Sequence, residues 1–139
     1  MKLKIAFWCH LLAILVVLIF GLMYSFKPTF MPYHSAAVQL PWQEVSPAIQ
    51  VLILALMRSI GGACFAIVIL ELFILFIPFR QGQTWAIWAV PAGGLCISAA
   101  GLYAMLYVSS NTPATPPLFA PAIGAVLLVS GLLLSLSRK

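Results

Sequence analysis

The chain alternates between long apolar segments and short segments that carry its charged, proline and polar residues. A helix needs about 20 apolar residues to cross the hydrocarbon core of a bilayer. Four segments reach this length, and the second of them is interrupted by two charged residues, Arg58 and Glu71. The predicted spans lie at roughly 5–26, 47–77, 85–108 and 118–136, with a first loop over 27–46.

After Arg80 the chain contains no charged residue until Arg138, a stretch too long for a single helix. A run of turn-forming residues over 109–117, Ser-Ser-Asn-Thr-Pro-Ala-Thr-Pro-Pro, divides it into two spans. The first loop is rich in proline and aromatic residues, so we expect it to lie on the membrane surface with a short helix around 35–39. The pattern predicts an all-α protein with one domain, 1–139, folded as a bundle of four transmembrane helices.

The composition agrees with this pattern and disfavours several classes of protein. Hydrophobic residues make up 64% of the chain and charged residues 6%, whereas a soluble domain has about 25% charged residues. A soluble enzyme, a nucleic-acid-binding protein and a disordered chain are therefore disfavoured. We expect the lipid bilayer as a partner of this chain, and no nucleic acid.

The cations predict the orientation of the bundle. Five of the seven lie on the side that carries both termini, at Lys2, Lys4, Arg80, Arg138 and Lys139. Because loops rich in Lys and Arg stay in the cytoplasm, we expect both termini to be cytoplasmic. The first apolar segment is longer than the core of a signal peptide, so we expect it to be retained as a span.

No pattern in the sequence points to catalysis or to a bound metal. The chain has no nucleophile elbow, P-loop or Cys-x-x-Cys pair. Its two carboxylates, Glu44 and Glu71, are too far apart to act as a catalytic pair. We expect no catalytic residue, no cofactor and no metal, and hence a protein that is not an enzyme.

Arg58 is the first candidate for a functional site, because a charged residue within a span is costly and by default suggests function. It lies about 11 residues into the second span, about 16 Å deep at 1.5 Å per residue. On a helix it shares a face with Gly61 and Gly62, which would let a ligand approach the backbone. With His34 and Tyr103, these residues form a predicted binding site for an anionic or carbonyl-bearing group. In the alternative, polar groups of a neighbouring helix satisfy a structural arginine.

His10 and Glu71 are the second candidate. They fall at similar depth on antiparallel helices, so a hydrogen bond between them is geometrically feasible. This polar pair is either a proton-linked site or a structural contact between helices. One His and one Glu are too few for a stable metal site, which usually needs three or four ligands.

Small residues predict close contacts between the helices. Gly94-x-x-x-Ser98 and Ala120-x-x-x-Gly124 have the spacing that allows two transmembrane helices to approach each other. Such contacts build either the interior of the bundle or the interface of a homodimer.

The stretch over 56–63, Leu-Met-Arg-Ser-Ile-Gly-Gly-Ala, followed by an apolar run, Arg80 and Trp85-Ala86, resembles small four-helix bacterial membrane proteins of the broad DoxX-like kind. In those proteins an Arg followed by Gly-Gly early in the second helix is common. The resemblance covers about half of the chain. It implies a multi-pass protein of the bacterial inner membrane and transfers no activity.

Three functions remain open at this point. The first is a non-enzymatic subunit or interaction protein, with a membrane-protein partner or a second copy of the chain. The second is a binder of a lipophilic or anionic-headgroup ligand, such as a lipid or a quinone, at an outward cavity near Arg58. The third is a small proton-coupled transporter that uses Glu71.

Overall fold

The computed structural model of the chain describes residues 1–137 and is all-helical in its regular structure. Two of the cations used to predict orientation, Arg138 and Lys139, lie outside the described residues. The helices are α1 (Lys2–Phe26), α2 (Pro32–Val38), α3 (Pro47–Ile74), α4 (Thr84–Asn111) and α5 (Phe119–Leu136). A short 3-10 turn, Trp42–Glu44, precedes α3, and a π-helical segment, Leu75–Phe79, continues it.

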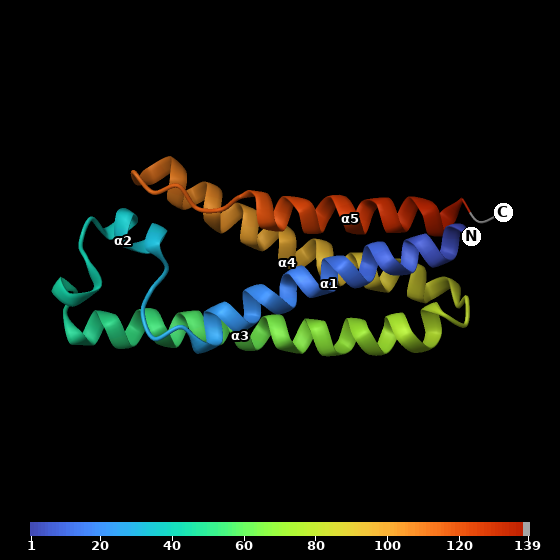
Figure 1. The fold of residues 1–139 in the computed structure, drawn as a ribbon, viewed down its shortest axis with the longest axis horizontal. Coiled ribbons are helices and arrows are strands. Elements are labelled where there is room, and N and C mark those ends of the chain that lie inside the picture. Colours follow the sequence, from blue (N-terminus) through green and yellow to red (C-terminus); the bar gives the residue numbers. More distant parts are fainter. Residues whose placement is uncertain (138–139) are drawn as a thin grey trace.

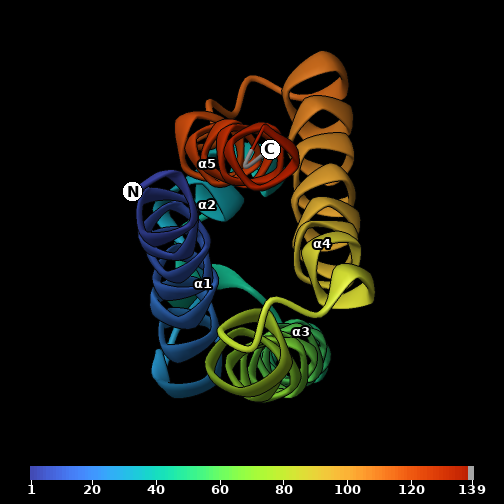
Figure 2. The same ribbon diagram turned by 90° about the vertical axis from the view of Figure 1, so that its right-hand side faces the viewer.

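Four of these helical segments are long and apolar enough to cross a membrane, which confirms the prediction of four spans. They pack antiparallel, with both termini at one end of the bundle and α2 at the other (Figure 1). Seen along the bundle, α1 lies between α3 and α5, and α4 closes the ring on the opposite side (Figure 2). We refer to the two ends as the terminus end and the α2 end.

Helix α3 and its π-helical continuation form the longest element, 33 residues over Pro47–Phe79. Pro47 stands at the first helical position, where its fixed φ suits the helix and its missing N–H costs nothing. Pro78 lies inside the π-helical segment, and a turn that includes Gly82 at φ 74° leads into α4. At 1.5 Å per residue this element is about 50 Å long, well beyond the roughly 30 Å of a hydrocarbon core.

Helix α4 extends to Asn111, three residues beyond the predicted end of its span. The predicted loop over 109–117 therefore begins with a helical turn. Its polar side chains bond back to the carbonyl groups of the preceding turn: Ser109 Oγ to Leu106, Asn111 Nδ2 to Tyr107 and Thr112 Oγ1 to Val108. These bonds satisfy carbonyl groups that the end of a helix leaves without partners.

A close crossing joins α1 and α3 at two glycines. A Cβ atom on Gly61 would lie 3.0 Å from the Gly21 carbonyl oxygen and 3.0 Å from the Ser25 nitrogen. A Cβ atom on Gly21 would lie 3.0 Å from the Cβ of Cys64. Gly61 therefore leaves no room for a side chain and Gly21 leaves little, so the backbones of α1 and α3 lie close together at this crossing.

Small residues of the two predicted contact motifs also meet between α4 and α5. Ser98 Oγ lies 3.5 Å from where a Cβ atom of Gly124 would stand. One small residue of each motif, Ser98 and Gly124, therefore meets the other inside the bundle.

We predict that Gly61→Ala destabilises the fold and that its neighbour Gly62→Ala does not. A methyl group at Gly61 overpacks the crossing, which costs about 1–3 kcal/mol. A methyl group at Gly62 meets nothing within 4 Å and improves helix propensity by up to about 1 kcal/mol. Thermal unfolding in detergent, followed by circular dichroism, measures both; equal losses would contradict the crossing.

Candidate functional site

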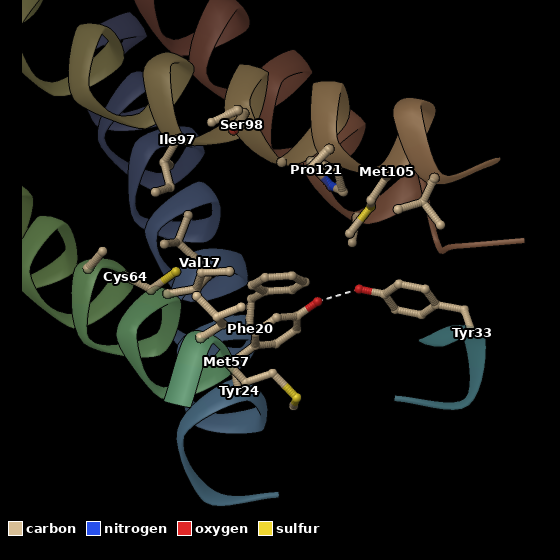
Figure 3. Close-up of a pocket in the computed structure, with 18 of the residues that line it drawn as sticks. Val17, Phe20, Tyr24, Tyr33, Met57, Cys64, Ile97, Ser98, Met105 and Pro121 are labelled. Atoms are coloured by element: carbon tan, nitrogen blue, oxygen red, sulfur yellow. Dashed lines mark hydrogen bonds between the residues drawn. The ribbon is translucent and has the colours of Figure 1, made fainter. Parts of the chain in front are cut away.

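A cavity of about 540 Å³ lies in the half of the bundle toward α2 (Figure 3). Side chains of α3 and α4 form facing walls, α1 and α5 contribute the remaining sides, and α2 lies across the end. Most of its lining is apolar. The wall from α4 includes small residues at Ser98, Ala100, Gly101 and Ala104.

The hydroxyl and imidazole groups of the cavity are at its two ends. At the α2 end the hydroxyl groups of Tyr24 and Tyr33 are hydrogen-bonded to each other (Figure 3). Phe20 stacks on Tyr24 with ring centroids 4.3 Å apart, which orients the phenol. At the deep end the hydroxyl-bearing side chain is Ser98. The arrangement suits a long apolar molecule with a small group that accepts a hydrogen bond.

Helix α2 is held over the cavity by a small apolar core of its own. This core consists of Tyr24, Phe30, Met31, Val45 and Met57. It joins the loop, α1 and α3, so that α2 has a defined position even though none of its own residues is buried.

His34 also lines the cavity, and its ring is fixed by the start of α2. The Met31 N–H donates a hydrogen bond to Nδ1 of His34 at 3.3 Å. Nδ1 must therefore be unprotonated, and burial lowers the pKa of His34 below its usual 6.5. Burial also raises the pKa of Tyr33, so both groups are neutral at pH 7. The cavity thus presents neutral groups at this end.

Arg58 lies on the outward surface of α3, away from the cavity, and it has no hydrogen-bond or ion-pair partner among the described residues. Ser25 packs against Gly61, and α1 runs antiparallel to α3, so Lys27 lies level with Arg58. About 22 residues separate Arg58 from Arg80, about 33 Å along a helix. This separation is close to the roughly 30 Å thickness of a hydrocarbon core.

The other members of the predicted Arg58 site are not brought together. Gly61 is buried in the crossing with α1, while Gly62 is exposed on the far side of the helix. Tyr103 is 72% exposed on the surface of α4. Of the five residues, His34 lines the cavity and Arg58, Gly61, Gly62 and Tyr103 do not.

His10 and Glu71 are both buried in the half of the bundle nearer the terminus end. The expected hydrogen bond between them is not formed, because neither nitrogen of His10 has a partner. The imidazole faces α5 at Gly131 and meets Phe79 edge-on, whereas the Glu71 carboxyl faces α4 at Gly93. The two side chains are directed at different neighbouring helices.

Among residues 1–137, no group of three or more His, Cys, Asp and Glu side chains is close enough to hold a metal ion. The three cysteines are unpaired.

The cavity residues missed by the sequence analysis are Tyr24, Tyr33 and the small residues of α4. The sequence did contain an indication of the cavity at Ala100, Gly101 and Ala104, since small side chains on one face of a helix leave space. The same pattern also predicts close helix packing. Only the separation of α3 from α4 in the fold distinguishes a cavity from close helix packing at these residues.

Comparison of the chain with models of protein families, with characterised proteins and with solved structures finds no match. The structure supports one part of the resemblance to DoxX-like proteins, which is the architecture of four long apolar helices.

We predict that acid loosens α2. Because the pKa of His34 is lowered in the folded state, its contribution to the capped form is complete above about pH 6.5 and is lost as the pH falls toward the lowered pKa. A protonated Nδ1 cannot accept the Met31 N–H. Hydrogen exchange of the α2 amides, corrected for intrinsic rates, should speed up between about pH 7.5 and pH 5.

His34→Asn is the matched control, because an amide oxygen replaces Nδ1 as an acceptor that does not titrate. In this variant the α2 amides should exchange at the same corrected rate at both pH values. Acid-induced loosening that persists in His34→Asn would assign the effect to another group.

Proposed function

We propose that this chain is a non-enzymatic membrane protein that binds a neutral lipophilic molecule in the cavity beneath α2. The observation that carries the proposal is the cavity itself: about 540 Å³ of largely apolar space within a bundle whose four long helices can span a bilayer. Its volume falls in the range of about 300–1,000 Å³ typical of small-molecule sites. A molecule dissolved in the bilayer is the natural occupant.

The lining favours a neutral ligand over an anionic one. No Lys or Arg is among the described residues that line the cavity, and Arg58 lies outside it. A charged head group in this space would lose its hydration without gaining a counter-charge. The phenols of Tyr24 and Tyr33 can instead donate to a carbonyl or hydroxyl oxygen, as a quinone or a long-chain alcohol carries.

The location and orientation remain those predicted from the sequence. We propose a bacterial inner membrane with both termini cytoplasmic. Among the described residues, Lys2, Lys4 and Arg80 are at the terminus end, which supports this orientation by the rule for positive charge. The α2 end of the cavity then faces away from the cytoplasm.

A second candidate is a subunit that associates with another membrane protein. The first eleven residues of α3 extend beyond the level of Lys27 and Arg58. They carry exposed apolar side chains at Ile49, Val51 and Leu52, and Val51 is 70% exposed. A protein partner would cover these side chains where lipid tails do not reach.

The binding proposal predicts that Gly101→Phe abolishes ligand uptake. Gly101 lines the cavity and faces free space apart from Pro121 at 3.8 Å, so a phenyl ring fills the cavity. Ala99→Phe, on the exposed face of the same helix, is the matched control. Binding of a pyrene-labelled long-chain alcohol, measured by fluorescence, should weaken at least about tenfold in Gly101→Phe and stay unchanged in Ala99→Phe.

The matching pyrene-labelled carboxylate decides the ligand class. We expect it to bind at least about tenfold more weakly than the alcohol, about 1.4 kcal/mol. Tighter binding of the carboxylate would favour an anionic ligand. If neither molecule binds, the ligand-binding proposal is wrong and the subunit candidate is the one that stands.

The subunit candidate makes a separate prediction. Val51→Lys should disrupt association through the projecting part of α3, because the ammonium group would be buried against an apolar partner. Crosslinking in the native membrane, with and without the substitution, measures this. Binding of the pyrene-labelled alcohol should be unaffected, since Val51 does not line the cavity.

A further inference from the structure

A second group of polar side chains lies between the cavity and the terminus end, and the proposed ligand does not use it. His10 of α1 is fully buried and Glu71 of α3 is 3% exposed. Both side chains can titrate, and both are buried within membrane-spanning helices in the half of the bundle toward the terminus end. Such residues inside a membrane protein are by default candidates for function.

Both side chains have polar atoms without hydrogen-bond partners. Among the described residues, the buried side-chain atoms in this condition are Nδ1 and Nε2 of His10 and Oε1 of Glu71. In folded proteins the large majority of buried polar side-chain atoms have a partner. If the two side chains served only to hold the helices together, these atoms would be hydrogen-bonded to each other or to neighbouring groups. They have no such partners.

The surrounding helices are built to admit these side chains. A Cβ atom on Gly131 of α5 would lie 2.7–2.9 Å from three atoms of the His10 ring. A Cβ atom on Gly93 of α4 would lie 2.8 Å from Oε1 of Glu71, and one on Gly94 would lie 3.2 Å from it. Three glycines on two helices thus make room for two inward-pointing titratable groups.

The described groups that face the two side chains carry no charge. From the π-helical segment Phe79 packs edge-on against His10, with ring centroids 5.4 Å apart. From α5, the Ser135 hydroxyl donates to the Gly131 carbonyl of its own helix at 2.8 Å. From α4, the polar group that approaches Glu71 is the backbone of Gly94. Among residues 1–137, neither a cation nor a second acid forms an ion pair or hydrogen bond with Glu71.

His10 and Glu71 lie between the terminus end and the cavity. His10 is about six residues from Lys4, about 9 Å along α1, so it lies within two turns of the terminus end. On the other side, Gly94 is one helical turn from Ser98, which lines the deep end of the cavity. The group therefore stands between the water at the terminus end and the floor of the cavity.

We propose that Glu71 and His10 form a proton-binding site that exchanges protons with the water at the terminus end. A proton from that water is held either on the carboxyl of Glu71 or on a ring nitrogen of His10, and it returns by the same route. A proton fits the donor set better than a metal ion does, because two ligands from two helices do not complete a metal site. The inference does not depend on the ligand of the cavity.

Labelling with a hydrophobic carbodiimide tests the site. This reagent reacts with a carboxyl that carries its proton: the proton moves to a carbodiimide nitrogen and the carboxylate oxygen adds to the central carbon. The chain has two acidic side chains, Glu44 and Glu71, so Glu44→Gln serves as the background and mass spectrometry of the labelled peptide identifies Glu71. We expect labelling to fall at least about tenfold from about pH 5 to pH 9. Glu71→Gln should abolish it.

His10→Gln tests the second member. An imidazole that can take up the proton stabilises the carboxylate, so its removal should raise the midpoint of the labelling curve by about one pH unit. Ser135→Ala is the control, because it changes an equally buried side chain of the same region that does not titrate. It should leave the midpoint unchanged. His10→Asn provides a second non-titrating variant if His10→Gln does not fold.

Two results would overturn the proposal. In the first, the Glu71 carboxyl of the parent chain does not react with the carbodiimide, or reacts equally at all pH values. This result does not require any variant to fold. The other is an unchanged midpoint in a folded His10 variant. Gly101→Phe separates this test from the binding proposal, since it should abolish binding of the pyrene-labelled alcohol and leave the labelling curve of Glu71 in place.

Discussion

The crossing of α1 and α3 at Gly21 and Gly61 is the contact on which the rest of the structure depends. In a bilayer, lipid tails are as apolar as leucine side chains, so helices associate by close packing more than by the hydrophobic effect. The two backbones can approach closely only where Cβ atoms are absent, and this determines the register of α1 against α3. From that register follow the common level of Lys27 and Arg58 and the position of the loop that carries α2.

The same constraint explains why the bundle has two chemically different halves. Toward the terminus end, glycines of α4 and α5 close around Glu71 and His10, and an apolar core surrounds them. Toward the α2 end, small residues of α4 at Ala100, Gly101 and Ala104 line the cavity. Glycine serves close packing at Gly61, room for a polar side chain at Gly131, and open space at Gly101. The role depends on what the facing helix presents.

Much of the architecture could be predicted from the sequence, because length and hydropathy alone limit what a 20-residue apolar segment can be. The four spans and the short helix of the first loop follow from that reasoning. The candidate site followed only in part. His34 could be recognised as a residue near the α2 end, and His10 and Glu71 as buried groups. The outward exposure of Arg58 and its common level with Lys27 could not be predicted, because they follow from the packing of α1 against α3.

The length of α3 also makes the protein sensitive to the thickness of its membrane. A span longer than the hydrocarbon core must tilt, distort the bilayer or expose apolar surface, each at a modest cost per ångström. The first eleven residues of α3, with Ile49, Val51 and Leu52 exposed, lie beyond the level of Arg58, so the thickness of the bilayer determines how much of this surface contacts lipid tails. Bilayers of different thickness will therefore place the α2 end, with the cavity beneath it, at different heights relative to the head groups.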